Sequence, residues 1–202
     1  LNKAQFLQLL QAHHQALQFT GHGCHDPETP ENSYLNLGED QLLLTDLLRH
    51  QQLDLSSYRL ICLTACESGI TTQSLLDEYI GWGSAFLAQQ ARTVISTLWN
   101  VDVRSSAFLI IRFYQLFSNP EKPISAPQAL REAQSWLSML DYEGLADWYT
   151  ELARLTTIPQ YRDYLHTEAA KLQADPEKIN GMERPFTDPY HWAGFICTGL
   201  NQ

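Results

Sequence analysis

The hydrophobic and polar positions of the chain alternate between blocks that are typical of buried strands and of amphipathic helices. Residues 59–64 (RLICLT) and 93–99 (TVISTLW) are nearly continuous apolar runs, which indicates strands of a parallel sheet that is covered on both faces. Shorter runs predict two more strands, over residues 16–20 and 192–198. Apolar residues at helical spacing predict helices over 3–13, 105–117 and 126–140, and a further amphipathic helix contained within 79–92. Because strands and helices alternate, the chain is predicted to form an α/β domain with a mostly parallel sheet flanked by helices.

The remaining segments predict loops and one insertion. Residues 24–33 (CHDPETPENS) hold two prolines and read as a loop, and residues 34–37 and 41–44 bracket Gly38 as a small hairpin. Thr45 is expected to cap a helix that runs to Arg49. Residues 141–180 break the strand–helix rhythm and are rich in Tyr, Leu and Ala, so we expect a helical insertion there. The prediction is a single domain over residues 1–202 that contains this insertion.

Two reactive residues follow strand ends. His22 lies two residues after Thr20, and Cys66 lies two residues after Thr64. Ligands of open parallel sheets bind beyond the carboxyl ends of the strands, and the intervening chain is long enough to cross over and place the two strands side by side. A histidine and a cysteine at adjacent strand ends form a candidate base and nucleophile.

The chemistry of such a pair is that of acyl transfer. The imidazole of His22 would accept the proton of the Cys66 thiol and later protonate the leaving amine. The backbone N–H groups of Gly23 and Cys66 are candidate donors to the oxyanion. The sequence therefore predicts a cysteine-dependent hydrolase site at this edge of the sheet.

The stretches FTGHG (19–23) and LTACESG (63–69) resemble the His and Cys motifs of caspase-like cysteine peptidases. Other segments of the sequence resemble one branch of these peptidases, the CHAT domain. These segments are AQQARTVISTLWNVD (88–102), APQALREAQSWL (126–137) and PYHWAGFICTG (189–199). This resemblance implies a caspase-like three-layer sandwich and a cysteine endopeptidase that cleaves a protein substrate with His22 as base and Cys66 as nucleophile, without a cofactor. It also implies upstream tetratricopeptide repeats or regulatory proteins as partners. The chain is most similar to the cyanobacterial type implicated in heterocyst development, which implies regulatory proteolysis in bacterial cell differentiation.

Specificity is predicted from the loop after strand 93–99. In related peptidases this loop lines the primary pocket, which implies a place there for Asp102, together with Trp99 and Ser96 from the strand before the loop. A carboxylate at Asp102 would pair with a guanidinium or an ammonium group, so cleavage after Arg or Lys is expected. The alternative for Asp102 is a cap on the helix that starts near Ser105, and one residue can serve both roles.

The composition of the chain argues against several other classes of protein. The formal net charge of −10 argues against a protein that binds the phosphate backbone of nucleic acids. The sequence has no run of about 18 apolar residues, so no membrane span is expected. Four cysteines are too few for a disulfide scaffold, which favours reduced thiols and a cytoplasmic location, with Cys62 and Cys197 as inert core residues. A zinc site is the less favoured alternative, because its ligand spacing is too tight for the usual patterns; it would use His22, Cys24, His25 and Cys66.

Two further expectations concern the context of the chain. The sequence has no initiator Met and is expected to be the C-terminal part of a longer protein. The alternative to a peptidase is a non-proteolytic interaction module that keeps the fold and uses the sheet edge or residues 141–180 as a docking surface.

Overall fold

The computed structural model describes residues 1–64, 72–73, 79–175, 177–178 and 183–199. Its central sheet has four strands in the order β1-β5-β8-β9, with bounds β1 Ala16–Thr20, β5 Leu60–Thr64, β8 Thr93–Thr97 and β9 Phe195–Gly199. The first three strands are parallel, and β9 runs antiparallel to β8. The predicted mostly parallel sheet is therefore confirmed.

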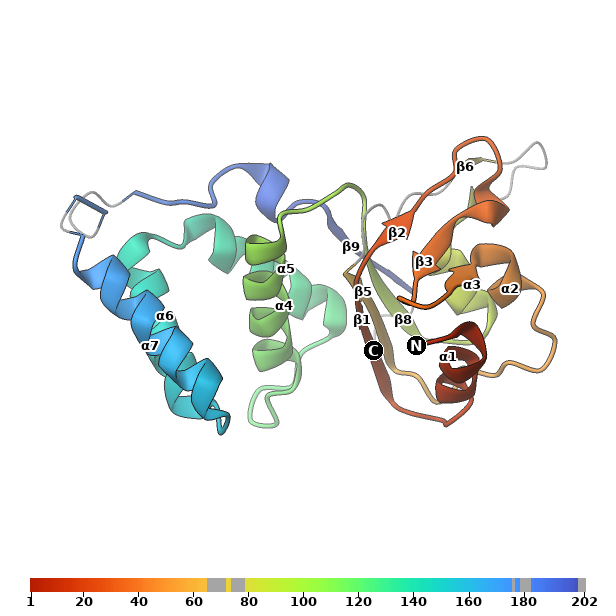
Figure 1. The fold of residues 1–202 in the computed structure, drawn as a ribbon, viewed down its shortest axis with the longest axis horizontal. Coiled ribbons are helices and arrows are strands. Elements are labelled where there is room, and N and C mark those ends of the chain that lie inside the picture. Colours follow the sequence, from red (N-terminus) through yellow and green to blue (C-terminus); the bar gives the residue numbers. More distant parts are fainter. Residues whose placement is uncertain (65–71, 74–78, 176, 179–182, 200–202) are drawn as a thin grey trace.

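Helices cover both faces of this sheet (Figure 1). One face carries α1 (Lys3–Leu10), α2 (Leu44–Leu48) and α3 (Trp82–Ala88), and the other carries α4 (Val103–Phe117) and α5 (Ala126–Met139). Side chains alternate across a strand, so β5 sends Cys62 into the core under α4 and Leu63 into the core on the α1 side. This arrangement confirms the predicted three-layer α/β sandwich.

A small three-stranded sheet lies beyond the carboxyl end of β1. It consists of β2 (Gly23–Cys24), β3 (Tyr34–Asn36) and β4 (Gln41–Leu43), all antiparallel. The predicted hairpin is confirmed as β3–β4, and Gly38 occupies its turn with a φ of 94°, a left-handed backbone that favours glycine. The structure adds β2 and the short turn of 3₁₀ helix η1 (Pro30–Asn32) within the predicted loop, and a separate antiparallel pair formed by β6 (Thr72–Gln73) and β7 (Tyr79–Ile80).

Some predicted helix and strand ends are wrong. The first helix ends at Leu10, before the left-handed backbone of His13, which has a φ of 53°. The final strand begins at Phe195 because residues 192–194 form a turn that follows the 3₁₀ turn η2 (Pro189–His191).

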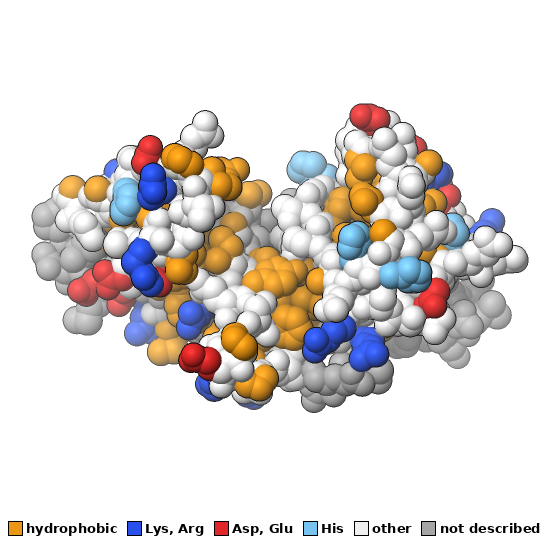
Figure 2. Space-filling model, turned by 90° about the horizontal axis from the view of Figure 1, so that it is seen from below, with side chains coloured by type: hydrophobic (Ala, Val, Ile, Leu, Met, Phe, Trp, Pro, Cys, Tyr) orange, Lys and Arg blue, Asp and Glu red, His pale blue; other side chains and the backbone are white. Residues whose placement is uncertain are grey.

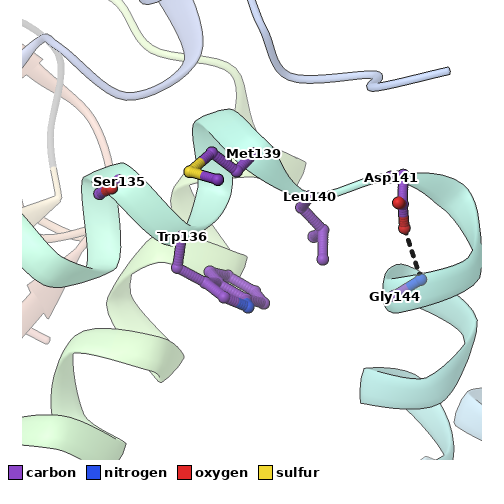
Figure 3. A pocket seen from close by; sticks show the side chains of 6 residues that line it. All are labelled: Ser135, Trp136, Met139, Leu140, Asp141 and Gly144. Atoms are coloured by element: carbon purple, nitrogen blue, oxygen red, sulfur yellow. Dashed lines mark hydrogen bonds between the residues drawn. The ribbon is translucent and has the colours of Figure 1, made fainter. Parts of the chain in front are cut away.

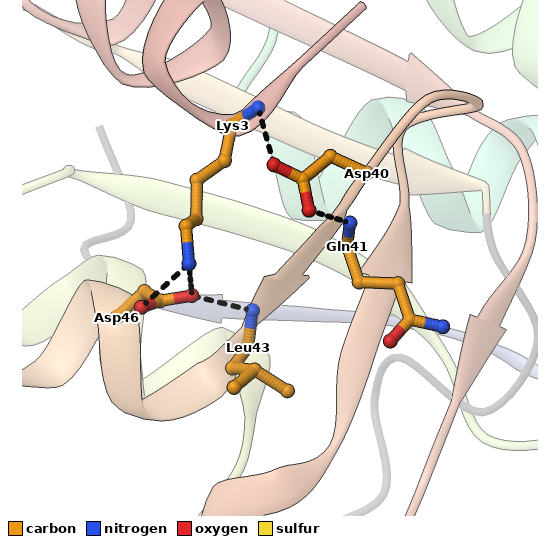
Figure 4. Close-up of polar contacts among 5 residues, drawn as sticks. All are labelled: Lys3, Asp40, Gln41, Leu43 and Asp46. Carbon is orange, nitrogen blue, oxygen red and sulfur yellow. Dashed lines mark hydrogen bonds and ion pairs between the residues drawn. The ribbon is translucent and has the colours of Figure 1, made fainter.

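The predicted cap at Thr45 is also wrong. Helix α2 begins one residue earlier, at Leu44, and the carboxylate of Asp46 accepts the backbone N–H of Leu43 at 3.0 Å. The same carboxylate binds the ammonium group of Lys3 at 3.1 Å (Figure 4). Asp40 accepts the backbone N–H groups of Gln41 and Lys3, and these bonds lower the pKa of its carboxyl group. This network fastens α1 to the β4–α2 corner.

The predicted insertion is a helical hairpin of α6 (Tyr142–Leu155) and α7 (Pro159–Gln173). It packs outside α4 and α5 and forms an additional layer (Figure 1). The ring of Phe108 in α4 meets Trp148 edge to face, with ring centres 5.2 Å apart. Arg104 in α4 adds a hydrogen bond of 3.1 Å to Glu168 in α7. None of the described helices is long and apolar enough to cross a membrane.

Candidate active site

His22 lies in the two-residue gap between β1 and β2 and is exposed to solvent. Two backbone hydrogen bonds fix this turn. The N–H of Gly21 donates to the carbonyl of Thr64 at 3.2 Å, and the N–H of Asn36 donates to the carbonyl of His22 at 2.8 Å. The histidine is thereby held between the end of β5 and the small sheet.

Strand β5 ends at Thr64, two residues before the predicted nucleophile in the sequence. Thr20 and Thr64 are direct register partners, so β1 and β5 end at the same level, as the sequence predicted. Cys66 itself lies outside the described residues. The structure thus brings His22 beside the last residue of β5, two residues before Cys66 in the sequence.

Gly23 presents a backbone N–H group away from its sheet. In an antiparallel ladder, hydrogen-bonded and non-hydrogen-bonded residue pairs alternate. The bond from Asn36 to His22 makes the next pair, Gly23 and Leu35, a non-hydrogen-bonded one. The N–H of Gly23 therefore points away from β3 and is not used in the β2–β3 ladder.

The side chain of Gln18 links β1, β5 and α4. Its Nε2 group donates to the hydroxyl of Thr64 at 2.9 Å and to that of Thr20 at 3.1 Å. Its Oε1 atom accepts the hydroxyl of Tyr114 at 3.1 Å. Burial raises the pKa of Tyr114, so this hydroxyl stays protonated and available as the donor. Sequence reasoning missed Gln18, although a polar residue in an otherwise apolar strand is a usable signal.

A cleft of about 680 Å³ opens between α4 and the ends of β1 and β5, and we call it the α4–β1 cleft. The strand side contributes Gln18, Thr20, Gly21, His22 and Thr64. The opposite wall comes from the loop after β8 and the first half of α4. It contains the polar residues Asn100 and Ser106 and the apolar residues Val101, Val103, Ala107, Ile110 and Ile111. The candidate base therefore lies at the edge of a cavity whose volume is in the range of ligand sites, about 300–1,000 Å³.

Asp102 caps α4. Its carboxylate accepts the backbone N–H of Ser105 at 2.9 Å, and its carbonyl accepts the hydroxyl of Ser106 at 2.6 Å. The capping alternative is thus confirmed. Asp102 does not occur among the described residues that line the α4–β1 cleft, although its neighbours Val101 and Val103 do.

The other two predicted pocket residues are placed differently. Ser96 is 1% exposed and shares a strand face with Val94, in the core on the α3 side of the sheet. Its hydroxyl has no hydrogen-bond partner within the described part of the chain. The indole Nε1 of Trp99 donates to the carbonyl of Tyr190 at 3.1 Å. The structure does not bring Ser96 or Trp99 into the described lining of the α4–β1 cleft.

Residues 189–194 brace the loop that follows β8. The ring of His191 bonds the hydroxyl of Ser105 at 3.2 Å, and the N–H of Leu98 donates to the carbonyl of Gly194 at 2.8 Å. A Cβ atom on Gly194 would lie 2.8 Å from the ring of Trp99 and 3.0 Å from the side chain of Val101. The sequence motif around Gly194 thus has a structural reason: only glycine fits against this loop.

The remaining thiols differ from a catalytic one. Burial raises the pKa of Cys62 to about 12 and that of Cys197 to about 11, so both stay protonated at neutral pH. Cys24 is exposed, and its thiol contacts the carbonyl of His25 at 3.8 Å. No group of three or more metal-ligating side chains occurs among the residues whose positions are described. The zinc alternative includes Cys66, which lies outside them.

A smaller cavity of about 310 Å³ lies between α5 and α6, with Trp136, Met139 and Leu140 on one side and Asp141 and Gly144 on the other (Figure 3). The carboxylate of Asp141 caps α6 by accepting the N–H of Gly144 at 2.8 Å. This cavity is a junction of helices and contains no candidate catalytic residue among its described lining.

Comparison with known protein families identifies a match for this chain. A family model described as CHAT domain matches residues 1–200. No curated protein sequence matches the chain significantly.

Proposed function

The chain belongs to the CHAT domain family, which is generally a caspase-like peptidase domain, and from that premise we propose that it is a cysteine endopeptidase with a dyad of Cys66 and His22. The observation that carries the proposal is the position of His22. It lies at the end of β1, level with the end of the strand that leads to Cys66, and at the edge of the α4–β1 cleft.

The proposed reaction proceeds by acyl transfer. The thiol of Cys66 gives its proton to the imidazole of His22, and the thiolate attacks the carbonyl carbon of the scissile peptide bond. The oxyanion that forms accepts hydrogen bonds from the N–H groups of Gly23 and Cys66. His22 then protonates the leaving amine, and a thioester to Cys66 remains. Water, deprotonated by His22, attacks the thioester and releases the acid.

The sequence position of Asp102 predicts cleavage after Arg or Lys, and this stays a prediction. A role in regulatory proteolysis of bacterial cell differentiation, in the cytoplasm and with upstream repeats as partners, is likewise proposed from the resemblance to the heterocyst type. Neither statement is needed for the proposed dyad.

Labelling by a peptidyl acyloxymethyl ketone tests the dyad, because this reagent alkylates a catalytic thiol that lies beside a histidine. The expected result is stoichiometric labelling that is lost in Cys66→Ala and in His22→Ala. Peptide hydrolysis is expected to fall by at least about a thousandfold in both variants. Cys24→Ser is the matched control, because this exposed thiol lies two residues from His22 and is not assigned to the dyad. Equal labelling of Cys66→Ala and the parent protein would overturn the proposal.

A second candidate function is a non-proteolytic interaction module. One observation favours it: the α6–α7 hairpin exposes a group of large apolar and aromatic side chains at the end of the molecule distant from the sheet, namely Leu155, Ile158, Tyr161 and Tyr164. Unpartnered apolar groups on a surface are typical of interaction sites. A chain whose His22→Ala variant retains full biological activity would favour this module over the peptidase.

A further inference from the structure

The chemistry of the α4–β1 cleft indicates which substrate side chain it accepts. The wall that faces β1 is a stripe along α4, with Val103, Ala107, Ile110 and Ile111 at the spacing of one helix face. Val103 is 85% exposed and Ile111 39% exposed, so this stripe is only partly covered by the rest of the protein. Seen from below, apolar side chains gather in the hollow between the helical lobe and the lobe that holds the sheet (Figure 2).

The polar groups on the opposite side of the cleft are engaged with one another. Gln18 donates to the hydroxyls of Thr20 and Thr64, and its acceptor atom takes the hydroxyl of Tyr114. These bonds leave a surface that offers few strong partners to a charged ligand group. The hydroxyl oxygens of Thr20 and Thr64 are thus engaged as acceptors, opposite the apolar side chains of α4.

The described lining of the cleft provides no counter-charge for an ionic substrate group. Among the described residues that line it there is no Asp, Glu, Lys or Arg, and His22 is the titratable one. The nearest carboxylate along the chain is that of Asp102, which is bonded to the N–H of Ser105 at the start of α4. A guanidinium or a carboxylate that enters such a cleft loses hydration without gaining an ionic partner, whereas an apolar side chain gains burial.

We propose that the α4–β1 cleft receives the side chain of the substrate residue that precedes the scissile bond, and that this residue is apolar, with Leu, Met or Phe preferred over Arg, Lys or Asp. The inference rests on the proposed peptidase function, because His22 at the edge of the cleft fixes where the bond is cut. The volume of about 680 Å³ leaves room for the larger apolar side chains. Val103, Ala107 and Ile111 are the specificity-determining residues.

Fluorogenic tetrapeptides that differ only at the residue before the cut test this inference with the whole chain. The panel contains Leu, Met, Phe, Arg, Lys and Asp at that position. The expected result is a kcat/KM for Leu, Met or Phe that exceeds the value for Arg by at least about tenfold, which is the range that burial of one or two carbon groups provides. A preference for Arg in the parent protein, with hydrolysis that depends on Cys66, would overturn the apolar cleft and leave the peptidase intact.

A second test introduces a carboxylate among the α4 residues that line the cleft. Ile111→Asp is expected to lower kcat/KM for Leu and raise it for Arg, by at least about tenfold in their ratio. Ile158→Asp is the matched control, since Ile158 is 48% exposed on the distant helical hairpin, and it is expected to leave the ratio unchanged. Val103→Asp repeats this test at a second residue of the cleft. Because Val103 is exposed, this substitution is not expected to disturb folding. An unchanged ratio in both wall variants would contradict the proposed site.

A different result is expected if the protein is not a peptidase. If none of the six peptides is hydrolysed and no peptidyl ketone of the Leu or Arg type labels Cys66, the peptidase proposal itself is overturned, and this inference with it. Labelling by the Leu-type ketone alone supports the cleft even if turnover of the peptides is slow.

Discussion

The side-chain amide of Gln18 donates a hydrogen bond of 2.9 Å to the hydroxyl of Thr64, and this bond joins the ends of the two strands that lead to His22 and Cys66. The same side chain accepts the hydroxyl of Tyr114 in α4, the helix that forms the other wall of the α4–β1 cleft. Gln18 therefore connects all three elements that surround the candidate site. It is a positioning residue in this arrangement, because it holds the strand ends rather than the reacting atoms.

Gln18→Leu is expected to lower kcat for peptide hydrolysis several-fold with a smaller change in KM. Loss of the amide frees the ends of β1 and β5, and each lost bond contributes about 0.5–1.5 kcal/mol to stability. The measurements are steady-state kinetics and urea unfolding. Gln8→Leu makes the same chemical change on the exposed face of α1 and is the control. Equal kinetics of the two variants would show that Gln18 does not position the site.

Gly194→Ala is expected to destabilise the fold and to disturb the cleft. The added Cβ would lie 2.8 Å from the ring of Trp99, so the loop after β8 must shift, at a cost of about 1–3 kcal/mol. Gly38→Ala is the comparison, because no atom lies within 4 Å of its added Cβ and only its φ of 94° is unfavourable, at about 1 kcal/mol. Thermal unfolding should show a loss in both variants, and KM should rise only in Gly194→Ala. An unchanged KM there would separate this loop from substrate binding.

Much of the fold was predictable because a strand that is buried on both faces has a nearly continuous apolar sequence. The strands 60–64 and 93–97 are buried on both faces, and the nearly continuous apolar runs of residues 59–64 and 93–99 indicate it. Strand β1 was found despite its exposed positions because Gly21, His22 and Gly23 mark its end. The errors concern ends set by side chains elsewhere. Helix α2 begins at Leu44 rather than after Thr45, because the carboxylate of Asp46 accepts the backbone N–H of Leu43.

The site was predictable only in part. The strand order that makes Thr20 and Thr64 neighbours followed from the parallel crossover, and with it the place of His22. The lining of the cleft did not follow, because it depends on which face of α4 the sheet leaves uncovered. Ser96 illustrates the difficulty. One residue along β8 separates the two faces of the sheet, and only the register shows that Ser96 lies on the α3 side.

Cys62 and Cys197 are expected to resist alkylation. Their pKa values of about 12 and about 11 lie above the ordinary value, so the thiols stay protonated as the pH rises to 8. Treatment with iodoacetamide followed by peptide mass spectrometry should label the exposed Cys24 and leave these two unmodified. Rapid modification of Cys62 in the folded protein would mean that the core beneath α4 opens.

Arg104→Ala is expected to loosen the α6–α7 hairpin from α4. The guanidinium donates to Glu168 at 3.1 Å and to the hydroxyl of Tyr149 at 3.4 Å, and Glu168 is the more buried partner. Hydrogen exchange should become faster across α7, while stability falls by about 0.5–1 kcal/mol, since the arginine is more than half exposed. Arg154→Ala removes a surface pair with Glu151 inside α6 and is the control. Exchange rates that rise equally in both variants would contradict a tie between the layers.

Substitutions at Asp102 separate its role as a cap from the predicted role in the substrate pocket. Asp102→Asn keeps a side chain that accepts the N–H of Ser105 but removes the charge, so stability is expected to change little and the order of preference among the peptides to stay the same. Asp102→Ala removes the cap and is expected to cost about 0.5–2 kcal/mol of stability, again without a change in preference. Urea unfolding and the six-peptide panel measure both effects. If Asp102→Asn retains its stability but loses hydrolysis after Arg selectively, the carboxylate reaches the substrate, and the preference for basic residues predicted from the sequence stands in place of the apolar one.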